Sequence, residues 1–318
     1  MSELAGTRVL VAGAAGFLGA NVVRALLPVA AEVHAVVRPA LPRPRLDGLP
    51  DLVVHEADVL DREAVALAVR AARADLVVNL VAPSGHPATP DERERMLAVS
   101  LAGTCNVLDA LAGGDCSRLV HVGSSLEYGS KSEPIREDDV LAPTTFRGAA
   151  KAAATLLCLQ APAPPAVVLR PFSVYGPWEP RRRLVPSVVC AALEGNELLL
   201  TAPGYRRDLV YVDDFAEAVL LTLAAGAEVD GEIVNVGSGR QTANEEVVAE
   251  VERLVGRELT VRVGAYPAQP PDTGFWVADV SKAKSVLGWA PRHPLEDGLS
   301  ATIDWFAAAG REAAHAAV

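Results

Sequence analysis

Residues 7–19, TRVLVAGAAGFLG, join a short apolar run to three closely spaced glycines. The apolar part is typical of a buried strand, and a helical pattern follows the glycines as far as about Leu27, before Pro28. A glycine turn between strand and helix lets backbone approach a pyrophosphate and offers it unpaired N–H groups, although the same turn can exist without a ligand. We expect these residues to contact a dinucleotide: Gly13, Gly16, Phe17, Leu18 and Gly19.

Strands and helices alternate through the first half of the chain. We expect further strands at residues 33–37, 52–55, 75–80, 118–122 and 166–170, and helices at 61–73, 91–112 and 147–161. Such alternation predicts βαβ units, and right-handed crossovers arrange these units as a doubly wound parallel sheet. The predicted fold class is therefore α/β, a Rossmann-type sheet with a smaller C-terminal substrate lobe.

The alternation weakens after residue 170, where proline, glycine and arginine crowd the sequence. We assign residues 1–170 to a dinucleotide-binding domain and expect residues 209–239 to return to it. That return would consist of a strand at 209–212, a helix at 213–225 and a strand at 232–236. The substrate-binding lobe would then be formed by residues 171–208 and 240–318.

The composition excludes several classes of protein. The 318 residues include 29 basic and 40 acidic side chains, for a formal net charge of −11, and half of them are hydrophobic. This balance is globular, and it argues against binding to nucleic acid, which needs a basic surface. The sequence contains no run of about 18 apolar residues, which is the length needed to cross a bilayer. The N-terminus lacks the pattern of a signal peptide, so we expect a cytoplasmic protein without membrane contact.

The four cysteines give no sign of a metal site. Cys105, Cys116, Cys158 and Cys190 form no CxxC pair and have no histidine at zinc-ligand spacing. We therefore expect structural thiols in a reducing compartment and no bound metal.

The end of the second predicted strand bears on the choice of cofactor. NAD-selective sites usually carry an acidic residue there, whereas this chain has Arg38, with Arg43 and Arg45 nearby. An arginine can pair with a 2′-phosphate, so we predict NADP, with NAD as the second choice; Arg38 as a solvated loop charge is the alternative. Asp58 and Val59 fit a contact to the adenine, although Asp58 could instead cap the next helix.

Further motifs follow in an order typical of one enzyme family. They are ADVLD at 57–61, AGTCNVLDA at 102–110, VGSSLEYG at 122–129, GAAKAAAT at 148–155, RPFSVYGPWE at 170–179, RRDLVYVDD at 206–214, NVGSG at 235–239 and DVSKAKSVLGWAP at 279–291. With these motifs the chain resembles the extended short-chain dehydrogenase/reductase family of NAD(P)-dependent nucleotide-sugar epimerases, dehydratases and ketoreductases. The resemblance covers nearly the whole chain and implies a nucleotide-sugar site between a Rossmann-type domain and the C-terminal lobe.

The resemblance also implies a catalytic set of serine or threonine, tyrosine and lysine, in which the tyrosine lies four residues before the lysine. Ser124 and Lys151 match this set, and Lys151 would also bind the cofactor. The tyrosine position, however, is occupied by Arg147. The family's tyrosine exchanges the alcohol proton while hydride moves, but an arginine stays protonated and can only stabilise negative charge. We therefore expect Arg147 to act as an oxyanion donor or a phosphate clamp.

Other side chains could replace the missing tyrosine as a proton donor. Glu127 is the carboxylate beside Ser124, and Tyr128 and Tyr175 belong to motifs that face the cleft in the family. We include Glu127 and Tyr128 among the candidate catalytic residues. Each of the three is also compatible with a purely structural role.

Arginines crowd two stretches that precede predicted elements of the substrate side, at 181–183 and 206–207. Guanidinium groups suit diphosphates because they bind them in bidentate fashion. The resemblance implies that Arg207 binds the nucleotide diphosphate, and we add Arg183 and Ser173 as substrate contacts. Arg181 and Arg182 are better explained as surface charge.

The stretch RPFSVYGPWEPRRRLVP, residues 170–186, most resembles epimerases and 4-ketoreductases of deoxysugar pathways. We therefore predict such an enzyme with an atypical proton path. A 4,6-dehydratase is disfavoured, because dehydratases carry Asp-Glu after the catalytic Ser/Thr and this chain has Ser125-Leu126. The alternatives are a non-redox enzyme catalysing an elimination or cyclisation and a non-catalytic dinucleotide-binding protein. A homodimer through the helices at 91–112 and 147–161 is also expected, as is common in the family.

Overall fold

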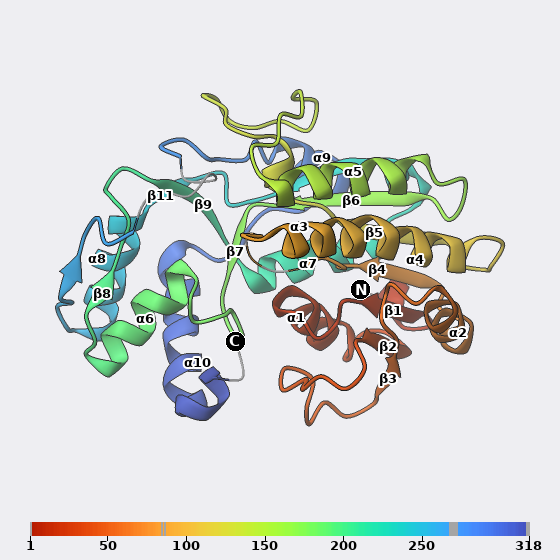
Figure 1. Ribbon diagram of the computed structural model, residues 1–318, viewed down its shortest axis with the longest axis horizontal. Coiled ribbons are helices and arrows are strands. Elements are labelled where there is room, and N and C mark those ends of the chain that lie inside the picture. The colour runs from red at the N-terminus through yellow and green to blue at the C-terminus, as the bar shows by residue number, and fades with distance from the viewer. Residues whose placement is uncertain (1, 84, 86, 267–272, 316–318) are drawn as a thin grey trace.

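A parallel sheet of seven strands forms the centre of the computed structural model, which describes residues 2–83, 85, 87–266 and 273–315 (Figure 1). Its order is β10-β6-β5-β4-β1-β2-β3, and every neighbouring pair is parallel. The chain thus starts in the middle of the sheet, builds one half, and returns to build the other. The predicted doubly wound α/β fold is confirmed.

The strands are short and rich in valine and leucine. Their bounds are β1 Arg8–Ala12, β2 Glu32–Val37, β3 Leu52–Glu56, β4 Leu76–Asn79, β5 Arg118–Val122, β6 Ala166–Pro171 and β10 Ile233–Val236. Alternate residues of β1 enter two different apolar cores: Val9 and Val11 pack on one face of the sheet, Leu10 and Ala12 on the other. Both faces of the sheet are therefore covered, as parallel sheets require.

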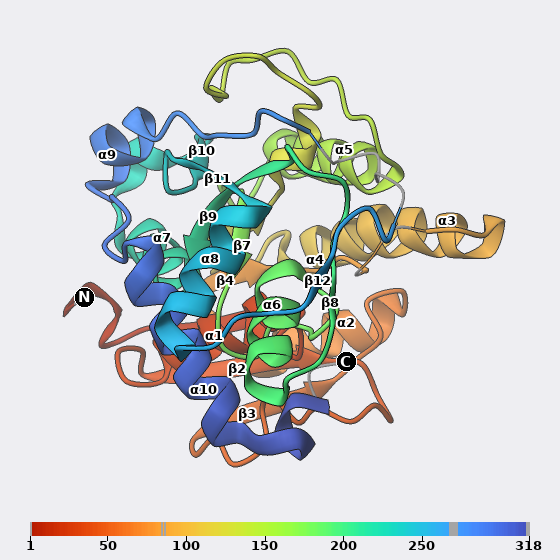
Figure 2. The same ribbon diagram turned by 90° about the vertical axis from the view of Figure 1, so that its left-hand side faces the viewer.

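Helices form a layer on each face (Figures 1 and 2). On one face α7 (Val212–Ala224) packs between α1 (Phe17–Leu26) and α9 (Ser281–Leu287). On the other, α4 (Gly103–Leu111) packs between α2 (Arg62–Ala72) and α5 (Phe146–Gln160). The single helix predicted for 91–112 is α3 (Pro90–Leu97), a π-helical segment (Ala98–Ala102) and α4 in unbroken succession.

The C-terminal lobe lies beside the large sheet, on the left in Figure 1 and in front in Figure 2. It contains the sheet β11-β9-β7, the strand pair β12-β8, and three helices that pack together. The bounds are β7 Ser173–Tyr175, α6 Leu184–Glu194, β8 Leu198–Leu199, β9 Arg206–Tyr211, β11 Gln241–Ala243, α8 Asn244–Val255, β12 Val261–Arg262 and α10 Leu295–His315.

One part of the predicted return to the large sheet is wrong. The strand expected at 209–212 belongs to β9, which pairs with β7 and β11 in the small sheet, whereas α7 and β10 do join the dinucleotide-binding part. The reason is that the chain leaves the large sheet at the end of β6. Strand β7, which follows almost at once, lies in the small sheet and pairs there with β9.

A buried ion pair connects three of these elements. Arg170 of β6 donates from Nε to Glu127 Oε2 at 2.8 Å, and both side chains are almost fully buried. The other carboxylate oxygen accepts from Ser124 N at 2.8 Å and from Thr155 Oγ1 of α5 at 3.1 Å. This one carboxylate therefore joins the turn after β5, strand β6 and helix α5.

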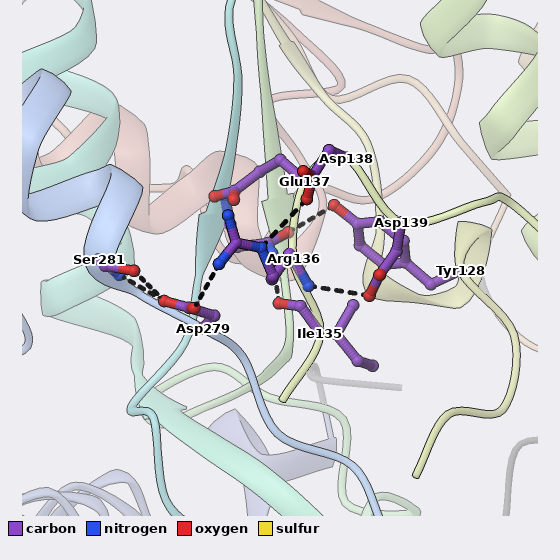
Figure 3. A network of polar contacts seen from close by, with 9 residues as sticks. Tyr128, Ile135, Arg136, Glu137, Asp138, Asp139, Asp279 and Ser281 are labelled. Carbon is purple, nitrogen blue, oxygen red and sulfur yellow. Dashed lines mark hydrogen bonds and ion pairs between the residues drawn. The ribbon is translucent and has the colours of Figure 1, made fainter. Parts of the chain in front are cut away.

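A second polar network fixes the segment that leads from this turn into α5 (Figure 3). Arg136 Nε lies 3.2 Å from Asp138 Oδ1, and its Nη1 lies 3.8 Å from Asp279 Oδ2. The backbone N–H of Arg136 donates to Asp139 Oδ2 at 3.0 Å. Ile135 exchanges two backbone hydrogen bonds with the strand-like segment around Ala278, donating to Val277 O and accepting from Asp279 N, each at 2.9 Å. The segment before α5 is thus held against the C-terminal part of the chain.

The buried pair predicts a large loss of stability when one partner is removed. Arg170→Met should lower the free energy of unfolding by about 3–5 kcal/mol, because Glu127 would remain buried without its counter-charge. Urea unfolding measures this loss. The matched control is Arg253→Met, which removes an exposed arginine paired with Glu250 and Glu296 and should leave stability nearly unchanged. Equal stability of both variants would contradict the role of the buried pair.

Candidate active site

A hollow of about 1280 Å³ lies at the carboxyl ends of β1 to β4. It includes the point between β1 and β4 where the strand order reverses, which is where doubly wound sheets bind ligands. Gly13 borders it with a φ of +83°, and a Cβ on Gly19 would lie 2.3 Å from the Gly13 carbonyl oxygen. The turn therefore needs glycine at both positions to bring its backbone and the start of α1 beside the hollow.

Most residues predicted to bind the cofactor lie at this hollow. Its lining includes Gly13, Gly16, Arg38, Asp58 and Val59. The next three, Phe17, Leu18 and Gly19, form the first turn of α1, which no side chain caps. Helix α2 is capped by Asp61, whose carboxylate accepts from the N–H groups of Glu63 and Ala64. The alternative role of Asp58 as that cap is therefore wrong.

The three arginines after β2 differ in whether their side chains have a partner within the protein. Arg43 Nη1 donates to Glu56 Oε1 at 2.9 Å, and Arg45 Nε donates to the Trp178 carbonyl at 3.1 Å. Arg38 is exposed at the edge of the hollow and pairs with none of the described residues. Its guanidinium is thus available to a ligand phosphate.

Helix α5 carries the second group of predicted site residues to the turn after β5. The Ser124 hydroxyl oxygen accepts from Leu126 N at 3.2 Å and so caps that turn. Gly148 allows the close contact of α5 with it, because a Cβ there would lie 2.4 Å from the Leu126 carbonyl oxygen. Arg147 and Lys151, four residues apart, project from one face of α5 beside the turn.

Burial changes the acid–base properties of both cations. Lys151 donates from Nζ to the Val122 carbonyl at 2.6 Å, and burial together with the charge of Arg147 lowers its pKa to about 8. Burial also lowers the pKa of Arg147 to about 10, with the charges of Arg183 and Arg182 adding to the effect. Arg147 remains charged at neutral pH, whereas burial brings the pKa of Lys151 much closer to neutral pH than that of an ordinary lysine.

The contacts of the proposed substitutes for tyrosine favour structural roles. Both oxygens of Glu127 are occupied in the buried pair described above. The Tyr128 hydroxyl donates to Asn235 Oδ1 at 2.7 Å, and Arg170 lies 4.6 Å from the centre of its ring. The Tyr175 hydroxyl donates to the Leu295 carbonyl at 3.4 Å. Burial raises the pKa of both tyrosines, which further disfavours proton exchange near neutral pH.

The predicted substrate residues fall into two groups. Ser173 and Arg207 lie on the paired strands β7 and β9 of the small sheet. Arg183 precedes α6, and its Nε donates to Glu179 Oε1 at 2.8 Å. Glu179 is buried, and burial raises its pKa to about 7. Sequence reasoning missed Glu179 and dismissed Arg182, although the run EPRRR at 179–183 contained both.

A membrane-spanning helix and a metal site are both absent from the described part of the chain. No helix within it is long and apolar enough to span a membrane. Its histidine, cysteine, aspartate and glutamate side chains form no group of three or more that could hold a metal ion. All four cysteines are free thiols, of which Cys158 and Cys190 are buried.

The match to known proteins covers most of the chain. Residues 9–237 match the profile of the NAD-dependent epimerase/dehydratase family. The chain belongs to this family. The resemblance inferred from the motifs is thereby confirmed, and so is the expectation of an NAD(P)-dependent enzyme.

Relatives in the NAD-dependent epimerase/dehydratase family differ in the reaction they catalyse. The chain is 31% identical over 310 residues to the low-salt glycan biosynthesis protein Agl12 of Haloferax volcanii, covering 94% of this chain and 98% of that protein. It is 28% identical to the dTDP-glucose 4,6-dehydratase of Xanthomonas campestris pv. campestris, over 93% and 92% of the two chains. The UDP-glucuronic acid 4-epimerase of Bacillus cereus, in complex with UDP-glucuronic acid and NAD, has a TM-score of 0.85 at 25% identity, over 93% and 98%.

The electrostatic interaction between the two cations of α5 predicts a titration shift. In Arg147→Met the pKa of Lys151 should rise above about 8 yet stay below the ordinary lysine value of about 10.4, because burial remains when the neighbouring charge is removed. The chain has only four lysines, so NMR titration of protein with isotope-labelled lysine can follow each one. Arg93→Met, which removes a cation of α3 that lies over Phe146, is the control. An unchanged Lys151 pKa in Arg147→Met would refute the interaction.

Proposed function

We propose that this enzyme acts on a nucleotide sugar as a 4-ketoreductase or epimerase whose proton path does not use a tyrosine. The observation that carries the proposal is that Lys151 of α5 donates to the Val122 carbonyl, two residues before Ser124, while α5 contacts the turn after β5 at Gly148. The relative of known structure that binds UDP-glucuronic acid and NAD supports the substrate class. The sequence motifs favour a deoxysugar pathway, and Ser125-Leu126 disfavours 4,6-dehydration.

Different residues of the chain can contribute different steps to such a reaction. A nicotinamide cofactor in the hollow would supply or accept the hydride. Ser124 can hydrogen-bond the reacting oxygen, and Arg147 can stabilise negative charge on it. Lys151, with a pKa of about 8, can give or take a proton near neutral pH, which Glu127 and Tyr128 in their buried contacts cannot do.

A non-redox reaction is the second candidate, because a charge fixed on Arg147 suits an oxyanion formed in an elimination or cyclisation. Calorimetric titration with NADPH, NADH and their oxidised forms, followed by turnover assays on nucleotide 4-ketosugars, separates the candidates. Oxidation of the reduced cofactor by a 4-ketosugar supports a ketoreductase, and conversion of a nucleotide sugar into its epimer without net change of the cofactor supports an epimerase; Lys151→Met should abolish either turnover. Cofactor binding with neither turnover favours the non-redox or non-catalytic alternatives, and no binding by protein free of co-purified nucleotide excludes hydride chemistry.

We further propose NADP as the preferred cofactor, since Arg38 is available to a 2′-phosphate. Arg38→Ala should weaken NADPH binding about tenfold or more, the worth of a charged hydrogen bond of about 1.5–3 kcal/mol, and leave NADH nearly unaffected. Calorimetry on both cofactors measures the difference. Arg43→Ala is the control, because Glu56 already pairs with Arg43. Preference of the unaltered enzyme for NADH would overturn this choice.

We also propose a cytoplasmic homodimer formed through α3, α4 and α5. Large apolar side chains on α5 are exposed, with Phe146 at 47%, Leu156 at 53% and Leu157 at 37%, and α3 packs beside them. The double variant Leu156→Glu/Leu157→Glu should therefore be monomeric in light scattering after gel filtration. Leu67→Glu, at an equally exposed position of α2, should remain dimeric. A monomeric unaltered protein would refute the proposal.

A further inference from the structure

Arg147 occupies the position of the family's tyrosine, and two further guanidinium groups act on it electrostatically. Arg147 lies in the first turn of α5, and Arg182 and Arg183 lie just before α6. The charges of Arg183 and Arg182 both lower the pKa of Arg147, so like charges from the two lobes act on one another. Such an arrangement costs free energy unless an anion lies among the groups.

The buried member of this cluster lacks a partner. Arg147 Nε is shielded from solvent, and none of the described residues accepts a hydrogen bond from it. Buried polar groups are paired in most native structures, and an unpaired one calls for an explanation such as a ligand. An acceptor supplied by a bound molecule provides that explanation here.

The carboxylates of the chain do not neutralise the cluster. Glu179 pairs with Arg183 through Oε1, while its buried Oε2 has no partner among the described residues. Arg181 is occupied by Glu194. No carboxylate in the described part of the chain pairs with Arg147 or Arg182, so the site keeps an excess of positive charge.

The solvent exposure of the three arginines indicates which part of a ligand each of them contacts. Arg182 and Arg183 are exposed, whereas Arg147 is mostly covered and shares its helix face with Lys151 beside the Ser124 turn. If the enzyme acts on a nucleotide sugar as proposed above, the sugar lies at Ser124 and Lys151. The group that reaches Arg147 is then attached to the sugar, and the diphosphate lies farther out.

We propose that Arg147, supported by Arg182 and Arg183, binds a carboxylate on the sugar, so that the substrate is a nucleoside diphosphate of an acidic sugar. A carboxylate offers two oxygens to guanidinium groups, which bind it in bidentate geometry. A 6-deoxysugar offers only a methyl group at the corresponding end and leaves Arg147 unpaired. The inference rests on the proposed function and replaces the deoxysugar that the motifs favour.

Binding of matched acidic and neutral ligands tests this inference. Calorimetry with the cofactor-loaded enzyme compares glucuronate with glucose, each as its uridine and thymidine diphosphate ester, and the free nucleoside diphosphates. The unaltered enzyme should bind the acidic ester at least tenfold more tightly than the neutral one. Arg147→Met should remove this preference, and Arg147→Lys should restore part of it.

The other outcomes separate the possible failures. Arg181→Met, one position from the cluster and paired with Glu194, should change neither affinity. Equal binding of acidic and neutral esters by the unaltered enzyme would overturn the acidic-sugar inference while leaving the nucleotide-sugar function intact. Equal weakening of both esters and of the free diphosphates in Arg147→Met would assign Arg147 to the diphosphate and likewise overturn it. Binding of the cofactor but of no sugar nucleotide would refute the proposed function itself.

Discussion

The carboxylate of Glu127 is the point on which the active-site region depends. It lies out of contact with water, and a buried charge is tolerated only when partners surround it. Its partners come from the turn after β5, from α5 and from β6, so none of these elements can move away without exposing an unpaired charge. Ser124 lies on that turn and Lys151 on that helix. A residue that the proposed mechanism does not use thus holds together the elements that carry Ser124 and Lys151.

The fold was largely readable from the sequence because its signals are local. Apolar runs such as residues 75–80 and 118–122 must be buried, and glycine is needed at 13, where φ is +83°, and at 19, where a Cβ would lie 2.3 Å from the Gly13 carbonyl oxygen. The sequence did not indicate which of the two sheets β9 joins. A strand of the pattern DLVY pairs equally well in either sheet, and the choice depends on where the distant β7 offers an edge.

The site was predictable in its positions and less so in its roles. Spacing predicted that Arg147 and Lys151 share one face of a helix, and the family resemblance implied that Ser124 lies near them. The role of Glu127 depends on Arg170 and Thr155, which are 43 and 28 residues away and carry no local sign of the contact. The excess charge around Arg147 was hidden for the same reason, because Arg182 and Arg183 approach it only after the two lobes have assembled.

The short connections between the two sheets have a mechanical consequence. Only Phe172 separates β6 from β7, and α7 follows β9 without an intervening residue, so two stretches of regular backbone run from one lobe into the other. A flexible tether would let the lobes swing apart and close as independent bodies. Here any such hinge motion would have to bend strands whose hydrogen bonds are already made. The position of one lobe relative to the other is therefore largely preset before any ligand binds.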